Sequence, residues 1–367
     1  MRLGILGGGQ LGRMLALAGY PLGLSFRFLD PSPEACAGQV GELVVGGFLD
    51  EEALRRFAEG LGLVTYEFEN VPVEAARFLE ARLPVLPPPK ALEVAQDRLA
   101  EKTFMQSLGI PTPPFRRVDG LGELREGLEA LGFPALLKTR WGGYDGKGQA
   151  LLTSWEEAER AFPALGGRGL ILEGYVPFQR ELSILGVRSR TGEVAFYPLV
   201  ENRHRGGILR LSLAPAPGVS PTLQQKAEAY ARKAMEALGY VGVLALELFQ
   251  VGEELLFNEM APRVHNSGHW TLEGAETSQF ENHLRALLGL PLGSVLPRGH
   301  SAMVNLIGVK PNFPQVLALP GAHLHWYGKE VRPGRKVGHI TLRRDTWEDL
   351  SRDLPHILAL AQAPEPV

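Results

Sequence analysis

The hydrophobic and polar positions of the chain form short strand-like runs separated by helical patterns, which is typical of a mixed α/β fold. At the N-terminus, the apolar run RLGIL precedes a glycine-rich turn, and the helical pattern MLALAGYPLG then ends at Pro21 and Gly23. The run SFRFLD predicts a second strand, and GLVTYEFENVP predicts another. These elements predict an N-terminal α/β domain over residues 1–95.

Proline-rich segments divide the next part of the chain. PVLPPP at 84–89 is a rigid connector, one continuous helix is expected over 90–108, and GIPTPPF follows at 109–115. Short strand and helix patterns lie between about 115 and 178, within a larger segment over 96–290. The run LILEGYVPFQRELSIL predicts a strand, a short bend and a second strand, and a helix is expected over 222–239.

The C-terminal part predicts a small β-rich domain over 291–367. SAMVNLIG indicates a strand, HLHWYGKEVRPGRKVGHITLR indicates a strand, a turn and a strand, and TWEDLSRDLPHILALA indicates a closing helix. Four cations, Lys329, Arg332, Arg335 and Lys336, surround the Pro-Gly turn. They are either ordinary polar surface or a site for a ribose phosphate.

Two strand-like runs, LALELF and LLFNEM, flank the segment VGEE at 251–254 and predict a β-hairpin. A turn centred on Glu253 places Glu247 opposite Glu259, with the two Cβ atoms roughly 4.5–5.5 Å apart. Facing carboxylates repel each other, and a divalent cation between them, such as Mg²⁺ with nucleotide phosphates, removes the repulsion. The alternative is an edge hairpin whose glutamates both face solvent.

Composition allows several packed domains and excludes some classes of function. The 367 residues are 45% hydrophobic with a net charge of −3 at pH 7, so no overall basic surface for nucleic acid is expected. The single cysteine, Cys36, excludes an internal disulfide and a thiolate metal cluster. No apolar run approaches the ~20 residues that cross a bilayer, and the N-terminus has no signal-type region. We expect a cytoplasmic protein that binds neither nucleic acid nor membrane.

The first glycine-rich turn matches the dinucleotide fingerprint G-x-G-x-x-G at Gly7, Gly9 and Gly12. The following strand ends at Asp30, near the distance expected for a ribose-binding acid. Alone, this pattern favours a nicotinamide-dependent dehydrogenase, but the same loop and helix N-terminus will hold any phosphate. Residues 66–70 (YEFEN) end another strand, where open α/β sheets contact their ligands.

A second glycine-rich loop lies in ALLKTRWGGYDGKGQ. Lys138 ends a buried strand, and glycines at 142, 143, 146 and 148 permit close backbone approach and movement. This predicts a flap over residues 142–149 that closes on nucleotide phosphates. It is not a Walker loop, because no G-K-[ST] precedes a helix. The alternative is a solvent-exposed hairpin tip.

Two further segments suggest nucleotide contacts. Exposed backbone over residues 173–176 could hydrogen-bond the edge of a base, and Glu181 on the next strand could accept from ribose hydroxyls. His204 lies between two arginines and before a glycine pair, which makes it a plausible phosphate neighbour.

The residues after Glu259 are too polar for a core segment, because burial of unpaired polar atoms is costly. The stretch PRVHNSGHW therefore belongs in a cleft. Arg263 is placed to stabilise charge on a transferring phosphoryl group or a carboxylate. His265 and His269 have the spacing of a zinc pair, but Pro262 and Gly268 disfavour the helix that such a zinc site needs.

Together these motifs resemble the 5-(carboxyamino)imidazole ribonucleotide synthase family of the ATP-grasp superfamily. The resemblance runs from LGILGGGQLGRM through GGYDGKGQ and NEMAPRVHNSGHWT to HWYGKEVRPGRKVGH, nearly the whole chain. The last two motifs together are specific to this family. The resemblance implies an α/β and α+β chain: a Rossmann-like pre-ATP-grasp domain, an ATP-grasp domain with a flexible lid, and the C-terminal β-rich domain.

The resemblance also implies an activity. The family's enzymes are ATP-dependent carbon–nitrogen ligases of purine biosynthesis, which carboxylate 5-aminoimidazole ribonucleotide with bicarbonate through carboxyphosphate and release ADP and phosphate. The implied cofactors are ATP and Mg²⁺, or Mn²⁺ in its place. The implied partners are a second copy of the chain in a homodimer and, for transient transfer of product, the downstream mutase.

Site residues carried over from the resemblance fall into four groups. The implied catalytic residues are Lys138, Asp145, Arg263 and His265, and the implied metal ligands are Glu247 and Glu259. The implied nucleotide-binding residues are Arg98, Lys138, Gly143, Tyr144, Asp145, Gly146, Lys147, Gly148, Gln149, Glu173, Gly174, Tyr175, Val176, Glu181, His204, Asn258 and Glu259. The implied substrate-binding residues are Gly9, Gln10, Leu11, Glu67, Asn266, Lys329, Arg335 and Lys336.

One position departs from the wider superfamily. Many of its members have an asparagine metal ligand two residues after the second glutamate, where this chain has Ala261. We expect water or a phosphate oxygen to take that place. The expected chemistry needs no nucleophilic side chain, which agrees with a chain whose one cysteine lies outside every motif.

Three alternatives to this ligase differ in the assay that would reveal them. A formate-using or D-alanyl-type ATP-grasp ligase would act on another acceptor. A dehydrogenase would quench nicotinamide fluorescence. A non-catalytic nucleotide-binding module would release no phosphate.

Overall fold

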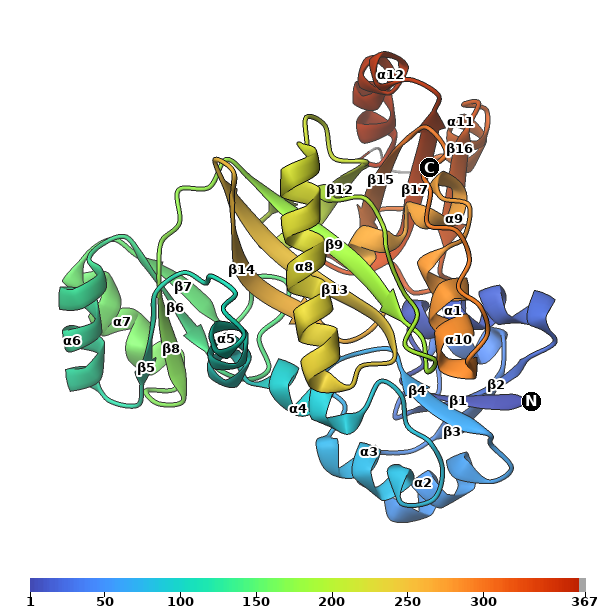
Figure 1. Cartoon of the computed structure of the whole chain (residues 1–367), viewed down its shortest axis with the longest axis horizontal. Helices are drawn as coiled ribbons and strands as arrows, with labels where there is room; N and C mark the ends of the chain where they lie inside the picture. Colours follow the sequence, from blue (N-terminus) through green and yellow to red (C-terminus); the bar gives the residue numbers. More distant parts are fainter. Residues whose placement is uncertain (363–367) are drawn as a thin grey trace.

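The computed structural model describes residues 1–362, and three β-sheets organise them (Figure 1). The N-terminal sheet is parallel, with strand order β3-β2-β1-β4. Its strands are β1 (Arg2–Leu6), β2 (Ser25–Asp30), β3 (Glu42–Val45) and β4 (Leu63–Tyr66). The accompanying helices are α1 (Gln10–Gly19), α2 (Glu51–Ala58) and α3 (Val73–Glu80), with 3₁₀ turns η1 (Tyr20–Leu22) and η2 (Cys36–Gln39). The predicted strand, loop and helix at the N-terminus are confirmed.

The helix predicted over 90–108 is wrong as a single element. The chain forms α4 (Pro89–Gln96) and α5 (Arg98–Ser107), with Asp97 between them in an extended conformation. The Asp97 side chain accepts a hydrogen bond from Leu99 N, and it also forms an ion pair with Arg140. Asp97 therefore caps the second helix and binds a loop from far along the chain, which local helical periodicity does not reveal.

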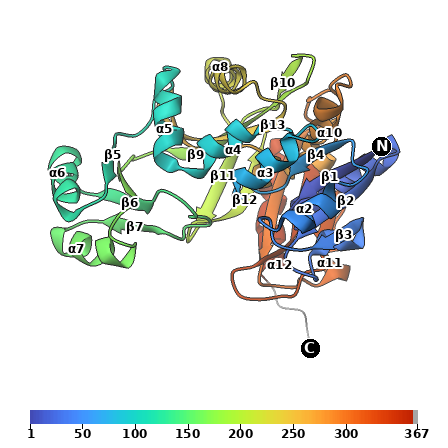
Figure 2. The same ribbon diagram turned by 90° about the horizontal axis from the view of Figure 1, so that it is seen from below.

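The lid, which we define as residues 115–178, contains a four-stranded sheet and projects from the rest of the molecule (Figures 1 and 2). Its strand order is β5-β8-β6-β7, and all the pairs are antiparallel. The elements are β5 (Phe115–Val118), α6 (Leu121–Leu131), β6 (Ala135–Thr139), β7 (Gln149–Leu152), α7 (Trp155–Ala164) and β8 (Leu170–Gly174). Lys138 lies on β6, as predicted, and the flap connects β6 to β7.

The largest sheet has nine strands, ordered β14-β13-β9-β11-β12-β15-β17-β16 with β10 paired to β9. Its first six strands along the chain are β9 (Arg180–Arg188), β10 (Val194–Phe196), β11 (Val200–Arg205), β12 (Ile208–Ala214), β13 (Gly242–Val251) and β14 (Glu254–Ala261). Helix α8 (Pro221–Leu238) crosses one face in Figure 1. The segment after β14 forms η3 (Asn266–Gly268), α9 (Thr271–Gly274) and α10 (Gln279–Leu288).

The C-terminal strands extend this same sheet. They are β15 (His300–Ile307), β16 (Ala322–Trp326) and β17 (Lys336–Arg344), and α11 (Phe313–Leu317) and α12 (Trp347–Leu360) pack beside them. β15 pairs with β12, so the sheet continues across residue 290 without a break. The predicted strands and closing helix of this region are confirmed.

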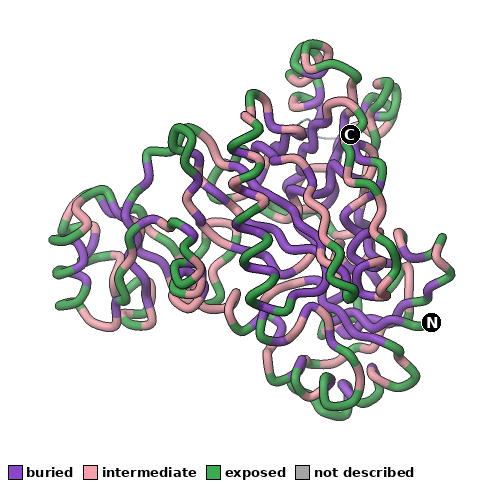
Figure 3. The backbone as a smooth tube through the Cα atoms, viewed as in Figure 1, coloured by how far each residue is buried: buried purple, intermediate pink, exposed green. Residues whose placement is uncertain are grey.

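Strand alternation separates an apolar face of the sheet from the face that carries polar residues. On β13, Leu244, Leu246 and Leu248 join a buried cluster with α8, whereas Val243 and Ala245 face a second cluster that includes residues of α10 and the N-terminal domain. Glu247 continues the row of Val243 and Ala245. Figure 3 shows how buried the central strands are in comparison with the outer helices. Glu247 therefore projects into the space between the large sheet and the N-terminal domain.

Among residues 1–362, none of the helices is long and apolar enough to span a membrane.

Candidate active site

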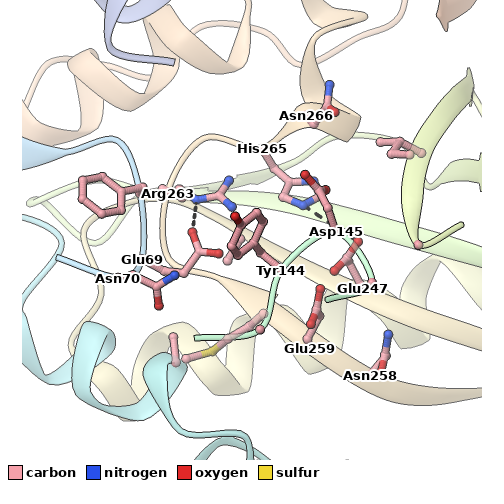
Figure 4. A pocket seen from close by; sticks show the side chains of 18 of the residues that line it. Glu69, Asn70, Tyr144, Asp145, Glu247, Asn258, Glu259, Arg263, His265 and Asn266 are labelled. Carbon is pink, nitrogen blue, oxygen red and sulfur yellow. Dashed lines mark hydrogen bonds and ion pairs between the residues drawn. The ribbon is translucent and has the colours of Figure 1, made fainter. Parts of the chain in front are cut away.

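A cavity of about 490 Å³ lies where the N-terminal domain, the lid and the large sheet meet (Figure 4). Gln10 and Leu11 line it from the first turn of α1, and Lys138 and the flap line it from the lid. Strands β13 and β14 supply Glu247 and Glu259. Residues from many separate elements thus converge on one space, as expected of an enzyme active site.

The predicted pairing of Glu247 with Glu259 is confirmed, but the register arises in a different way. The turn is tighter than predicted, since Val251 pairs with Glu254, and this register alone would place Asn258 opposite Glu247. A β-bulge at Asn258 shifts the pairing by one residue and brings Glu259 opposite Glu247. Lys102 Nζ donates to the Asn258 carbonyl oxygen at 2.5 Å and thereby holds the bulge.

The two facing carboxylates differ in charge. Burial and the neighbouring Glu259 carboxylate raise the pKa of Glu247 well above its ordinary value. Burial also acts on Glu259, but the hydrogen bond from Glu247 and the charge of Arg98 outweigh it and lower its pKa. Arg98 Nη1 donates to Glu259 Oε2 at 2.9 Å. The close approach of the two carboxylates thus favours a shared proton or a bound cation between them.

Lys138 is held by a buried carboxylate rather than left exposed to the cavity. Its Nζ lies 2.6 Å from Glu173 Oε2, and Lys102 Nζ lies 3.0 Å from Glu173 Oε1. Burial opposes ionisation of Glu173, but the two ammonium groups lower its pKa to about 2. Burial lowers the pKa of Lys138. Glu173 thus keeps Lys138 in place beside the glutamate pair.

The flap lies against two distant segments. Lys336 Nζ donates to Asp145 Oδ1 at 2.9 Å, which connects the flap to β17. At the turn between β11 and β12, a Cβ placed on Gly207 would lie 2.3 Å from Gly146 Cα. Backbone packs on backbone here, so both glycines are required for the contact.

Strand pairing brings Glu181 next to His204, although 23 residues separate them in the sequence. They lie on β9 and β11, and His204 Nδ1 is 2.8 Å from Glu181 Oε2. Both line the cavity.

The polar segment after β14 also lines the cavity, and Figure 4 shows Arg263 and His265 near Tyr144 and Asp145 of the flap. Arg263 forms an ion pair with Glu69, shown dashed in Figure 4. His265 Nε2 lies 3.9 Å from Glu247 Oε1, and burial together with the charge of Arg263 lowers the pKa of His265 to about 3. Asn266 exchanges two hydrogen bonds with Asn305 of β15.

The N-terminal loop does not offer its amides to a pyrophosphate. Gly8 N donates to Asp30 Oδ2 at 2.9 Å, and Gly9 N and Gly12 N donate to the two oxygens of Glu67. In a dinucleotide site these backbone donors would face phosphate oxygens. The carboxylates occupy that position, which argues against the dehydrogenase hypothesis.

Most of the predicted site residues line the cavity. These are Gln10, Leu11, Arg98, Lys138, Gly143, Tyr144, Asp145, Gly146, Gln149, Glu181, His204, Glu247, Asn258, Glu259, Arg263, His265, Asn266 and Lys336.

Ten predicted residues are not among those that line the cavity: Gly9, Glu67, Lys147, Gly148, Glu173, Gly174, Tyr175, Val176, Lys329 and Arg335. Glu173 was predicted to offer backbone to a base, but it pairs with β5 on one side and β6 on the other, and its carboxylate binds two lysines. Gly9 and Glu67 hydrogen-bond each other. Lys329 donates to Gln10 Oε1 at 3.0 Å, so it lies behind a lining residue.

Sequence reasoning missed several lining residues, among them Gln96, Glu101, Arg140 and Tyr327. Arg140 follows Lys138 by two residues, and this proximity was a usable signal. Gln96 and Glu101 lie on either side of the break at Asp97, which the continuous-helix prediction concealed. Tyr327 immediately precedes the cation-rich turn, but no local pattern distinguishes it from a core tyrosine.

Comparisons with known proteins agree with this architecture. Three family models match consecutive parts of the chain: the ribonucleotide synthetase preATP-grasp domain over 1–96, the ATP-grasp domain over 103–280, and the phosphoribosylaminoimidazole carboxylase C-terminal domain over 301–353. The N5-carboxyaminoimidazole ribonucleotide synthase of Pseudomonas aeruginosa is 52% identical over 363 residues, which cover 99% of this chain and 100% of that protein.

Solved structures give the same result. The crystal structure of N5-carboxyaminoimidazole ribonucleotide synthetase from Thermus thermophilus is 76% identical, with a TM-score of 0.95 and 100% of both chains covered. The Aspergillus clavatus synthase in complex with ADP and 5-aminoimidazole ribonucleotide is 34% identical, with a TM-score of 0.91 and 98% of both chains covered. The predicted ATP-grasp fold is confirmed, and the chain belongs to the N5-carboxyaminoimidazole ribonucleotide synthase family of ATP-grasp ligases.

Proposed function

We propose that this enzyme uses ATP and bicarbonate to carboxylate the amine of 5-aminoimidazole ribonucleotide, releasing ADP and phosphate. The observation that carries the proposal is the facing pair Glu247 and Glu259, beside Arg98 and Lys138, in a cavity that the flap borders. Two anionic ligands among cations are suited to a metal-bound triphosphate. Family membership supports the same activity.

The residues present fit a divalent cation held by Glu247 and Glu259. Without a cation, the two buried carboxylates repel each other, and this repulsion together with burial raises the pKa of Glu247. Both groups are oxygen ligands, as Mg²⁺ prefers, and Mn²⁺ accepts the same donors. Within residues 1–362, no set of three or more His, Cys, Asp or Glu side chains is arranged to hold a metal, so phosphate oxygens or water would complete the coordination. When bound, such a cation neutralises charge on the phosphates.

We assign the nucleotide to the side of the cavity that the lid covers. Lys138 would contact phosphate oxygens while Glu173 holds its ammonium group in place. Glu181 would accept from the ribose hydroxyls, with His204 orienting it through their hydrogen bond. The flap, including Tyr144 and Gln149, would exclude water from the phosphates.

The proposed first step joins bicarbonate to the γ-phosphoryl group. A bicarbonate oxygen forms the new bond to phosphorus, and the bond between phosphorus and the β-bridging oxygen breaks as ADP leaves. Arg263, held in position by Glu69, stabilises the negative charge of the carboxyl group that has joined the phosphate. The product of this step is carboxyphosphate.

The second step transfers the carboxyl group to the amine. The amine nitrogen forms a bond to the carboxyl carbon, and the bond from that carbon to the phosphate oxygen breaks. The two events occur either together or in sequence, with CO₂ formed first. The nitrogen then loses a proton. Asp145 and His265 line the cavity near Arg263 and are proposed to position the acceptor. No covalent enzyme intermediate is needed.

We assign the ribonucleotide to the side of the cavity nearest the N-terminal and C-terminal segments. Gln10, Leu11, Asn266 and Lys336 line that side, and Lys329 and Arg335 lie behind it. Lys336 would exchange its Asp145 partner for the substrate phosphate, because a dianionic phosphate attracts an ammonium group more strongly than one carboxylate does.

The remaining assignments are proposals that follow from family resemblance. We propose domains over 1–95, 96–290 and 291–367, a homodimer, a cytoplasmic location where ATP and ribonucleotides are made, and transient transfer of product to the downstream mutase. Sedimentation, cell fractionation and coupled assays with the mutase would test the last three.

Phosphate release tests the proposed reaction directly. With MgATP and bicarbonate, release should require 5-aminoimidazole ribonucleotide, and no nicotinamide nucleotide should be bound in a fluorescence titration. Release that depends instead on formate or D-alanine would favour another ATP-grasp ligase. Release without any acceptor would contradict the proposed coupling.

A further inference from the structure

A row of buried polar side chains crosses the large sheet beneath the cavity and ends at His265. Ser183, Asn202 and Ser212 lie on the neighbouring strands β9, β11 and β12, and Ser267 lies in η3. Each of the four is at most 4% exposed, and His265 is 8% exposed. Polar groups at this depth are stable only if they hydrogen-bond one another.

The hydrogen bonds of the row all run in one direction. Ser212 Oγ donates to Asn202 Oδ1 at 2.7 Å, since an amide oxygen only accepts. Asn202 Nδ2 then donates to Ser183 Oγ at 2.9 Å, and Ser183 Oγ donates to Ser267 Oγ at 2.8 Å. Ser267 is left with its hydroxyl proton to donate, and His265 Nδ1 lies 2.8 Å away. The row therefore delivers a donor to that nitrogen.

A second donor acts on the same nitrogen and does not depend on how the amide of Asn202 is oriented. Ser267 N donates to His265 Nδ1 at 3.2 Å. A backbone N–H cannot reverse its role, so Nδ1 must be an acceptor. The proton of the neutral imidazole is then on Nε2, the nitrogen that lies 3.9 Å from Glu247 Oε1.

We propose that Ser183, Asn202, Ser212 and Ser267 are positioning residues that hold His265 as the Nε2–H tautomer, so that it donates a hydrogen bond to a bicarbonate or carboxyphosphate oxygen. This inference rests on the proposed function for the identity of the oxygen that accepts the hydrogen bond. His265 is then a hydrogen-bond donor in the reaction and not the base that removes the amine proton.

A neutral His265 could accept a proton at Nε2 only if its own hydrogen were on Nδ1, and this would reverse the direction of the hydrogen bonds in the row. Nδ1 would then carry a hydrogen directed at Ser267 N–H, and two donors would face each other. Ser267 would have to donate to Ser183 Oγ, which already accepts from Asn202 Nδ2, so the buried Ser183 hydroxyl proton would lose its acceptor in the row. The row therefore excludes the other tautomer by its direction, a constraint that an apolar contact could not impose.

The tautomer can be measured in the wild-type protein by ¹⁵N NMR with ¹⁵N-histidine labelling at pH 8. The signals of His265 are identified as those missing from the spectrum of His265→Gln. The proposal predicts a pyrrole-type shift at Nε2 and a pyridine-type shift at Nδ1. The opposite assignment overturns it.

Kinetics of variants test the positioning role. Ser267→Ala should lower kcat for ribonucleotide-dependent phosphate release about 10-fold, a typical effect for the partner of an active-site histidine, with little change in KM for ATP. Asn202→Asp makes the central residue an acceptor on both sides, and should lower kcat and mix the two His265 tautomers. Ser267→Thr keeps both donors and should restore most of kcat.

Ser189→Ala is the matched control, since Ser189 is also fully buried, lies just beyond β9, and accepts a hydrogen bond from Thr191 N. It should change neither kcat nor the His265 shifts. Wild-type kcat in both Ser267→Ala and Asn202→Asp would overturn the positioning role even with the predicted tautomer. If the wild-type enzyme does not turn over the ribonucleotide, the proposed function fails, while the nitrogen shifts still decide the tautomer.

Discussion

Glu173 connects the stability of the lid to the position of Lys138, and Glu173→Gln tests that connection. The carboxylate lies between Lys102 and Lys138, whose side chains are 0% and 6% exposed. The glutamine has nearly the same shape but no charge, so both ammonium groups would remain buried without a counterion. Breaking a buried ion pair in this way costs about 3–5 kcal/mol.

The depressed pKa of Glu173 gives an independent value for the free energy that its ion pairs contribute to stability. A fall from the ordinary 4.5 to about 2 corresponds to about 3 kcal/mol of stabilisation at 1.36 kcal/mol for each pH unit. Because the folded-state pKa lies below the unfolded-state value, this stabilisation is fully present above about pH 5. It is lost as the pH falls from about 4.5 towards 2.

Urea unfolding followed by tryptophan fluorescence measures the effect, since Trp141 and Trp155 both lie in the lid. Glu173→Gln should lower the free energy of unfolding by about 3 kcal/mol at pH 7, and the difference from wild type should shrink below pH 4.5. Glu129→Gln, an exposed position on α6, is the control and should change stability little. A loss below about 1 kcal/mol at pH 7, or a difference independent of pH, would refute this view of Glu173.

Three further predictions concern the cavity itself. Glu259→Gln removes one of the two facing carboxylates and should abolish ribonucleotide-dependent phosphate release while the circular dichroism spectrum stays unchanged; normal turnover would exclude the metal assignment. Lys336→Ala should raise KM for the ribonucleotide roughly 10- to 100-fold, the value of a charged hydrogen bond, and raise KM for ATP far less; equal effects on both would remove Lys336 from the substrate side. Gly207→Ala places a Cβ 2.3 Å from Gly146 Cα and should lower kcat/KM for ATP about 10-fold through overpacking. Gly206→Ala, whose φ is also positive but whose Cβ would meet open space, is its control, and an equal loss there would show that strain rather than flap contact matters.

The paired glutamates show what hairpin reasoning can and cannot predict. The predicted turn placed Glu247 and Glu259 face to face, and the pair is observed because the bulge at Asn258 offsets a turn that is tighter than predicted. The bulge at Asn258 was not predicted, because Lys102, which stabilises it, comes from a helix 156 residues earlier. The predicted pair was correct although the predicted turn was one residue too wide.

Long-range polar contacts account for what local patterns did not predict. The helix over 90–108 is interrupted because Asp97 binds Arg140, and helical periodicity contains no information about that partner. Glu173 was predicted to offer its backbone to a base, which stays a prediction, but the contacts of its carboxylate with two lysines from different elements were not predicted. In both cases the side-chain partner lies on another element, and the local sequence does not reveal it.

Family resemblance supplied what local patterns could not. Strand pairing predicted a cation and phosphates at Glu247 and Glu259, but only the motifs NEMAPRVHNSGHWT and HWYGKEVRPGRKVGH indicated the ribonucleotide. The polar row from Ser212 to Ser267 was visible in neither, since the pairing of β9, β11 and β12 brings three of its members together and Ser267 contacts them from η3.

Transfer of oxygen from bicarbonate to phosphate tests the proposed reaction most directly. With ¹⁸O-labelled bicarbonate, MgATP and 5-aminoimidazole ribonucleotide, ³¹P NMR of the released phosphate should show one ¹⁸O atom in each phosphate. That atom is the bicarbonate oxygen that attacks the γ-phosphoryl group. Phosphate without ¹⁸O, formed at the same rate as the carboxylated product, would contradict activation of bicarbonate by ATP in this cavity.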